Sequence, residues 1–198
     1  MSKVCYDIER FKGKLPDQKL FPYEKSEKLK EIQRELKDLF AVFNKIVRKY
    51  RLTYCLDSGT LLGAVRHHNI IPWDDDIDVQ MSREDISVLR KNKAELNKLG
   101  YTITYNDKIY RFKRNLKGKI PYIDIFEVDD FDNKIKYSNE RNREIWPKYW
   151  FKHDEKYPLK LYKFGRMSVF GPNNPYPYLE RAYGEWNKGV VWNTHHTI

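Results

Sequence analysis

The sequence predicts a mixed α/β (α+β) domain in which helices flank a small mixed sheet. Apolar residues recur at steps of three and four between residues 24 and 50, which is typical of one amphipathic helix. A strand, a glycine turn and a second helix follow over residues 52–67, and further segments alternate polar and apolar residues as strands do. Helices and strands that alternate along a chain favour a sheet covered by helices.

The remaining elements are expected in a regular order. A helix starts at Ser82, where Asp85 three residues later resembles a capping box, and it stops at Gly100. The strand predicted over residues 120–128 contains Asp124 inside an apolar run. We expect helices over residues 83–99, 137–150 and 178–186, and strands over residues 101–105, 109–113, 120–128 and 166–170.

Length and composition favour one globular domain over residues 1–198. The 40% hydrophobic content suffices for a core. We divide the chain into a polar leader (1–23), a core (about 24–130) and a C-terminal extension (about 131–198). No apolar run approaches the roughly 20 residues of a membrane span, and the first residues lack the apolar segment of a secretory signal. We therefore expect a cytoplasmic protein without an integral membrane segment. We also expect its two cysteines to be reduced thiols.

The formal net charge of +10 is unevenly distributed. Residues 1–51 carry 14 basic and 8 acidic side chains, and residues 131–198 carry 12 and 7, whereas residues 52–130 carry 12 and 13. A surface that binds nucleic acid is expected to concentrate positive charge. An acidic centre between basic flanks instead favours a metal site that a phosphate-bearing substrate approaches.

The acidic centre contains the run Asp74-Asp75-Asp76-Ile77-Asp78. If this run is extended, the period of two places Asp74, Asp76 and Asp78 on one face. Several carboxylates on one face repel one another unless a cation compensates them. Oxygen ligands without nearby cysteine or histidine favour Mg²⁺ or Mn²⁺ over zinc, and Asp124 from the later strand would complete a carboxylate triad with Asp76 and Asp78.

Upstream of the aspartates, Ser58 and Gly59 break the strand before the helix that starts at Thr60. Such a turn presents backbone N–H groups at a helix N-terminus, where phosphate binds favourably. Three features follow one another along the chain: a strand with a glycine turn, a pair of aspartates, and a third aspartate between isoleucines. This order resembles the pattern of the nucleotidyltransferase (polymerase-β-like) superfamily.

A narrower resemblance rests on longer motifs. The run SGTLLGAVR at residues 58–66, followed by IPWDDDID at residues 71–78, closely resembles the signature of the LicD/fukutin family. The segments YIDIF at residues 122–126 and YLERAYGEW at residues 178–186 are similar to its downstream aspartate motif and its C-terminal segment. The resemblance spans roughly residues 29–192.

This resemblance implies a nucleotidyltransferase-like fold and a LicD-type phosphotransferase. Members transfer phosphocholine or ribitol phosphate from a CDP-linked donor to a sugar hydroxyl of a glycan, for example in lipopolysaccharide biosynthesis. It implies that Asp76, Asp78 and Asp124 are catalytic and, with Asp74, bind the metal. Asp124 would bind a second metal or act as the base.

The same resemblance implies a set of substrate-binding residues around the glycine turn. Arg66 would either contact a phosphate or be a surface charge, and Trp73 would either stack on the donor or shape the turn. The substrate-binding set is Ser58, Gly59, Thr60, Gly63, Arg66 and Trp73.

Two other functions stay open at this stage. The first alternative is a nucleotidyltransferase that moves NMP from an NTP and releases pyrophosphate, because the aspartate pattern is common to both reactions. The second is a basic nucleic-acid-binding module, which the acidic centre disfavours. The partners we expect are thus a CDP-linked donor and a glycan acceptor, not nucleic acid, and the sequence does not give the oligomeric state.

Overall fold

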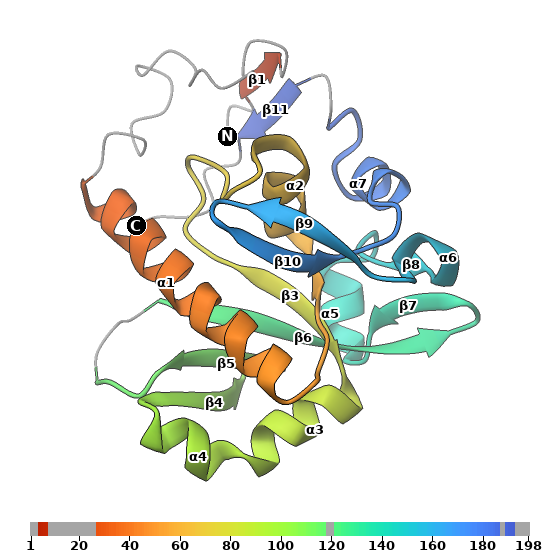
Figure 1. Cartoon of the computed structure of the whole chain (residues 1–198). Coiled ribbons are helices and arrows are strands. Elements are labelled where there is room, and N and C mark those ends of the chain that lie inside the picture. The colour runs from red at the N-terminus through yellow and green to blue at the C-terminus, as the bar shows by residue number, and fades with distance from the viewer. Residues whose placement is uncertain (1–3, 8–26, 118–120, 187–188, 193–198) are drawn as a thin grey trace.

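The computed structural model describes residues 4–7, 27–117, 121–186 and 189–192, and a seven-stranded mixed sheet forms its centre (Figure 1). Its strands are β2 (Cys55–Leu56), β3 (Asp78–Ser82), β4 (Tyr101–Asn106), β5 (Ile109–Arg114), β6 (Tyr122–Phe131), β7 (Lys134–Tyr137) and β8 (Phe151–Lys152). Five of them follow the order β2-β3-β6-β5-β4, and β7 and β8 continue from β6. Strands β3 and β6 are parallel, and the other neighbours are antiparallel.

Two small antiparallel sheets lie beside the central one. One is the hairpin of β9 (Lys160–Phe164) and β10 (Met167–Gly171). The other pairs β1 (Val4–Asp7) with β11 (Gly189–Trp192). Four residues of the predicted polar leader therefore form a strand, and the rest of the leader lies outside the described residues.

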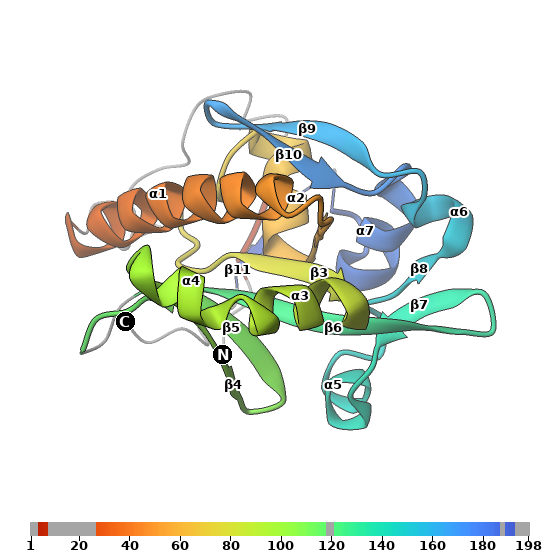
Figure 2. The same cartoon turned by 60° about the horizontal axis from the view of Figure 1, so that its bottom comes forward.

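Helices flank the sheet, so the predicted fold class is confirmed. Figure 2 shows α1 over the sheet, with the β9–β10 hairpin on the same side. Within the described ranges, no helix is both long and apolar enough to cross a membrane. The helices are α1 (Glu27–Lys49), α2 (Ser58–His67), α3 (Arg83–Lys91), α4 (Lys93–Lys98), α5 (Glu140–Ile145), α6 (His153–Lys156) and α7 (Tyr176–Tyr183).

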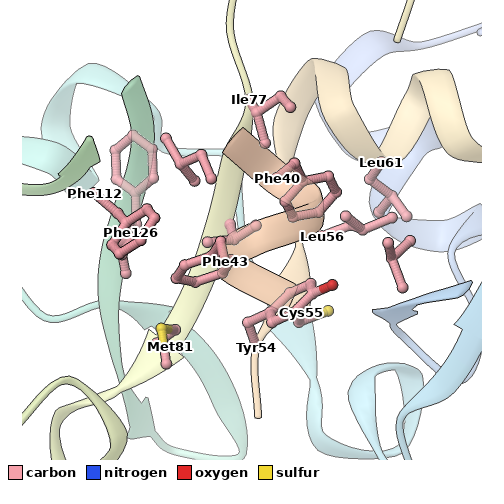
Figure 3. Close-up of a cluster of buried hydrophobic side chains, with 14 of the residues drawn as sticks. Phe40, Phe43, Tyr54, Cys55, Leu56, Leu61, Ile77, Met81, Phe112 and Phe126 are labelled. Atoms are coloured by element: carbon pink, nitrogen blue, oxygen red, sulfur yellow. The ribbon is translucent and has the colours of Figure 1, made fainter. Parts of the chain in front are cut away.

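The apolar face of α1 packs on the sheet through aromatic side chains (Figure 3). The ring of Phe43 lies 5.4 Å from that of Tyr54 and 5.3 Å from that of Phe112, and Phe40 packs edge-on against Phe164. All five rings are almost completely buried. Each buried aromatic side chain contributes about 2–3 kcal/mol, so α1 is held firmly on β5 of the central sheet and on the β9–β10 hairpin.

The predicted helix over residues 83–99 is wrong in one respect, because it is broken at Asn92 into α3 and α4. The Asn92 side chain donates a hydrogen bond to the Val88 carbonyl at 2.9 Å. A short polar side chain that bonds the preceding turn competes with helix continuation. Both pieces still pack where the unbroken helix was expected, beside β3, β4 and β6.

The predicted helix over residues 137–150 is also wrong over most of its length. Tyr137 ends strand β7, and the helical part is confined to α5. Strands β6 and β7 form a hairpin whose two turn residues, Asp132 and Asn133, have φ of 51° and 62°. Positive φ at both positions is the requirement of a type I′ turn, which Asn and Asp tolerate. The sequence thus held a hairpin signal that the apolar periodicity concealed.

Candidate active site

A cleft of about 810 Å³ opens where α1, the N-terminus of α2 and the central strands meet. Carboxylates and aromatic side chains both contribute to its lining. The polar lining consists of Lys28, Glu31, Glu35, Ser58, Gly59, Asp74, Asp75, Asp76, Asp78, Arg111 and Asp124, and the remaining lining residues are Ile32, Ile109, Pro121, Tyr122, Phe126, Trp146, Tyr149 and Tyr183.

The parallel pairing of β3 with β6 brings two of the predicted catalytic aspartates together. Asp78 and Asp124 are register partners, and the Asp124 N–H donates to the Ile77 carbonyl at 2.9 Å. Partners in register lie on the same face of a sheet. Two carboxylates from segments 46 positions apart in sequence therefore face the cleft side by side.

Asp74, Asp75 and Asp76 lie in an irregular segment before β3, not on the strand. The expectation that a period of two aligns Asp74, Asp76 and Asp78 is therefore wrong, although all three line the cleft. One oxygen from each of the three consecutive carboxylates lies within 4.8 Å of the others. We call residues 71–77 the aspartate loop. The three carboxylates come together through the irregular backbone of this loop, not through the alternation of side chains along a strand.

The electrostatics of this cluster correspond to a site for a hard cation. Burial raises the pKa of Asp78 well above its usual range, and the charge of Asp76 acts in the same direction. Burial also raises the pKa of Asp74, and Asp76 again adds to the effect. Carboxyl groups in this state either take up a proton or require a compensating cation. The donor set near them is oxygen only, which suits Mg²⁺ or Mn²⁺.

Arg111, which the sequence did not single out, binds Asp124 directly. It is the register partner of Asp124 in the β5–β6 pair, and its Nε donates to Asp124 Oδ1 at 3.1 Å. Its guanidinium also lies over the ring of Tyr122, 4.6 Å from the centroid. Side chains alternate between the two faces of β5, so a known β5–β6 register would have placed Arg111 on the same face of the sheet as Asp124. That register is the information that the sequence lacked.

The N-terminus of α2 reaches the cleft through Ser58 and Gly59. The N-cap residue, Asp57, makes no side-chain hydrogen bond to the helix. It is instead fully buried and accepts hydrogen bonds from Tyr137 Oη, at 2.7 Å, and from Tyr178 Oη. Because its natural capping carboxylate is held elsewhere, the first turn of α2 is suited to an anionic ligand.

The buried Asp57 belongs to a network that the sequence also did not reveal. Tyr178 Oη accepts a hydrogen bond from the Ser58 N–H at 3.2 Å, so the network also holds the α2 terminus. Lys156, another fully buried group, donates to Gln80 Oε1 at 2.9 Å. Asp57 opposes the lowering of the Lys156 pKa by burial, so the two charges lie within electrostatic reach. A buried anion is thereby partly balanced by a buried cation.

Thr60 and Gly63 do not line the cleft, in contrast to the expected turn over the donor phosphates. Thr60 is buried, and its Oγ1 accepts a hydrogen bond from the Asp78 N–H at 2.8 Å. A Cβ at Gly63 would come within 2.5 Å of the Asn69 carbonyl oxygen. Thr60 therefore fixes strand β3, and Gly63 allows the chain after α2 to pack closely against the helix.

Arg66 and Trp73 also lie outside the cleft lining. Arg66 Nε donates to His67 Nε2 at 2.9 Å, and the ring of Trp73 packs edge-on against His67. Burial lowers the pKa of Arg66 to about 10, and Tyr183 and Asp74 act in the opposite direction. Arg66 therefore lies within electrostatic reach of the aspartate loop without lining the cleft.

Comparisons with known proteins identify the family of the chain. The profile of the family described as LicD/FKTN/FKRP, nucleotidyltransferase domain, matches residues 51–174. The chain belongs to this family. An uncharacterized protein of Rickettsia prowazekii is 39% identical over 155 residues, which cover 78% of this chain and 56% of the relative. The chain spans about half the length of this relative and of a second one, from Rickettsia typhi, whose coverage is 47%.

Two characterized relatives share shorter or more distant similarity with this LicD-family chain. The lipopolysaccharide cholinephosphotransferase LicD of Haemophilus influenzae is 44% identical over 57 residues, which is 29% of this chain and 22% of that protein. The ribitol 5-phosphate transferase FKRP of Mus musculus is 27% identical over 158 residues, 71% of this chain and 28% of that protein. The crystal structure of ANT(2")-Ia with adenylyl-2"-tobramycin matches with a TM-score of 0.46 and 11% identity, covering 69% of this chain and 70% of that one.

Aromatic side chains of the cleft lining were not among the predicted site residues. Trp146, Tyr149 and Tyr183 come from the C-terminal extension. Tyr149 packs edge-on against Tyr183 at 5.8 Å and against Tyr178 at 6.0 Å. The extension of this LicD-family chain therefore builds one side of the cleft, and Tyr178 connects that side to the network around Asp57.

Gly59→Ala is expected to weaken divalent cation binding by about tenfold, the size of effect seen when a metal ligand is displaced. The loss of stability should be small. A Cβ at Gly59 would lie 2.8 Å from Asp74 Oδ2, so the carboxylate has to move. Mn²⁺ titration and thermal unfolding check both parts. Gly63→Ala is the matched control: its Cβ meets backbone atoms, so it should lower stability by about 1–3 kcal/mol, as overpacking does. Unchanged Mn²⁺ affinity in Gly59→Ala would contradict the assignment of Asp74.

The stability of the metal-free protein should fall with rising pH because of Asp124. Burial raises its pKa to about 6, and Arg111 acts in the opposite direction. Because the pKa of Asp124 is higher in the folded than in the unfolded protein, protonation of this carboxyl stabilises the fold. This contribution is complete below the pKa in the unfolded state, about 4, and is lost as the pH rises through the pKa in the folded state, about 6. Between pH 5 and 7.5, the wild type should lose about 1 kcal/mol more than Asp124→Asn in urea unfolding. Identical pH dependence in both proteins would contradict this.

Proposed function

We propose that this chain is a metal-dependent transferase. It moves a phosphorylated alcohol of the phosphocholine or ribitol phosphate type from a CDP-linked donor to a sugar hydroxyl of a glycan. Family membership supports the reaction class, and the names of LicD and FKRP give the two alcohols. The observation that carries the proposal is the pairing of Asp78 with Asp124 beside the aspartate loop in the cleft.

The residues that would hold the cation are Asp76, Asp78 and Asp124, with Asp74 from the aspartate loop. When bound, Mg²⁺ or Mn²⁺ neutralises the charge of the donor diphosphate and of the phosphoryl group in flight. Because Asp124 lies directly across from Asp78, we assign it to the cation rather than to the base. Its contact with Arg111 fixes its orientation.

The other cleft residues bind and orient the donor and acceptor. The N-terminus of α2 at Ser58 and Gly59 would donate backbone N–H groups to a donor phosphate. The acceptor hydroxyl attacks the phosphorus that carries the alcohol, the bond from this phosphorus to CMP breaks, and the hydroxyl proton leaves to a carboxylate or to water. Placing the two reactants in line and excluding water along Trp146, Tyr149 and Tyr183 lowers the barrier.

A nucleotidyltransferase that releases pyrophosphate is the second candidate, because the family profile itself is described as a nucleotidyltransferase domain. The two reactions differ in what leaves. Incubating the protein with CDP-choline, CDP-ribitol and each NTP, with Mg²⁺ and a glycan acceptor, and following CMP and pyrophosphate distinguishes them. Acceptor-dependent CMP release is expected. Pyrophosphate release without CMP release from either CDP donor would favour the second candidate.

A further inference from the structure

Helix α1, which the sequence assigned only to packing and which lies outside the profile match of residues 51–174, contacts the aspartate loop through Gln33. Its Nε2 donates to the Asp74 carbonyl at 2.7 Å, and to the carbonyls of Ile71 and Pro72 at 3.1 Å each. Three carbonyls from one loop converge on one amide group of a residue about 40 positions away in sequence. This is a cross-link between a helix and a loop, not a local turn.

The helix end of this cross-link is rigid. Leu29 and Leu36, one turn to either side of Gln33, are buried, and Phe40 and Phe43 fix α1 on the sheet. Gln33 is half-buried and is not among the residues that line the cleft. It therefore touches neither the proposed donor nor the cation, and any influence it has passes through the aspartate loop.

The loop end needs such an anchor. Asp74, Asp75 and Asp76 crowd three carboxyl groups together, and those that are ionised repel one another, which favours opening of the loop. Regular strand pairing starts at Asp78, and the Ile77 carbonyl just before it accepts from the Asp124 N–H, so residues 71–76 lie outside the ladder of the sheet. A donor that binds the loop carbonyls from the side of α1 opposes this opening without neutralising the carboxylates.

We infer that Gln33 is a positioning residue that fastens the aspartate loop to α1 and so sets the geometry of the carboxylates. Its effect on cation binding rests on the proposed function, whereas its effect on the loop does not. Residues that orient metal ligands from outside typically change metal affinity by about 10–100-fold when replaced. Glutamine suits this task because its amide offers two N–H donors on a side chain long enough to reach from a helix to a loop.

The test compares Gln33→Met, which keeps the length and removes the donors, with Lys45→Met on an exposed position of the same helix. Hydrogen exchange of residues 70–78 is measured in metal-free protein, and Mn²⁺ binding is measured with Mn²⁺ alone by electron paramagnetic resonance. We expect at least about tenfold faster exchange in the loop, and about tenfold weaker Mn²⁺ binding, for Gln33→Met only. The thermal midpoints of both variants should stay close together.

The two readouts separate the two proposals. If wild-type protein binds no Mn²⁺, the metal-dependent function fails, and loop exchange still decides the role of Gln33. Unchanged loop exchange in a folded Gln33→Met overturns the inference. If Gln33→Met does not fold, Gln33→Glu repeats the measurement with a side chain of the same shape that lacks the donors. Failure of both variants to fold would replace the positioning role with a structural one and also overturn the inference.

Discussion

Asp78→Asn is expected to lower kcat for CMP release by at least about 10³-fold, the range seen when a major charge-stabilising group is lost. Asp78 pairs in register with Asp124 and feels the charge of Asp76. Its replacement removes a ligand without changing the size of the side chain. The same loss is expected for Asp76→Ala and Asp124→Asn. Steady-state kinetics with a CDP-linked donor measure the effect.

The stability of Asp78→Asn should move in the opposite direction. In metal-free buffer at neutral pH, the variant should be as stable as the wild type or more stable, because a buried like-charge repulsion is relieved. Asp130→Asn, an exposed position on the same strand as Asp124, is the matched control and should change neither quantity. Marked unfolding of Asp78→Asn would show that the carboxylate serves the fold rather than the reaction.

Tyr178→Phe is expected to lower the free energy of unfolding by about 2–3 kcal/mol, the cost of removing one partner from a buried charged group. The substitution removes a hydrogen bond to the fully buried Asp57 and the acceptor of the Ser58 N–H. Urea unfolding measures the loss. Tyr176→Phe, on the same helix but 58% exposed, should cost less than about 0.5 kcal/mol.

A double-mutant cycle separates the network from simple packing. In an Asp57→Asn background, Tyr178→Phe should cost at least about 1 kcal/mol less than in the wild type, since the buried charge is gone. Additive effects would mean that the Tyr178 hydroxyl stabilises the protein independently of Asp57. Coupled effects would support the view that the pair holds the N-cap carboxylate away from the α2 terminus.

The sequence predicted those parts of the fold that depend on local pattern. The amphipathic stripe predicted α1 with nearly correct ends. Helix α2 was predicted too, but it starts at Ser58, so the expected turn at Ser58 and Gly59 is part of the helix rather than a break before Thr60. The β6–β7 hairpin was missed because its signal is the backbone conformation of Asp132 and Asn133, not periodicity. The break at Asn92 was missed because it depends on one side-chain hydrogen bond.

The sequence motifs identified several residues of the cleft correctly, but they did not show where in the fold these residues lie. Asp74, Asp76, Asp78 and Asp124 all line it, but the first two lie on a loop that Gln33 contacts from another helix. Arg111, Gln33 and the Asp57 network were missed because each depends on a long-range contact. Thr60, Gly63, Arg66 and Trp73 belong to the same family signature, yet none of them lines the cleft. A motif therefore identifies what is near the cleft without showing which side chains face it.

In the proposed site, aspartates from two parallel strands and one loop hold a divalent cation beside the donor diphosphate. A crystal structure with Mn²⁺ and CDP-choline bound, with an anomalous difference map at the manganese edge, tests it most directly. We expect an anomalous peak in the cleft within coordination distance of Asp78 and Asp124, and in contact with a donor phosphate. A fully occupied donor with no peak between these two carboxylates would contradict the claim.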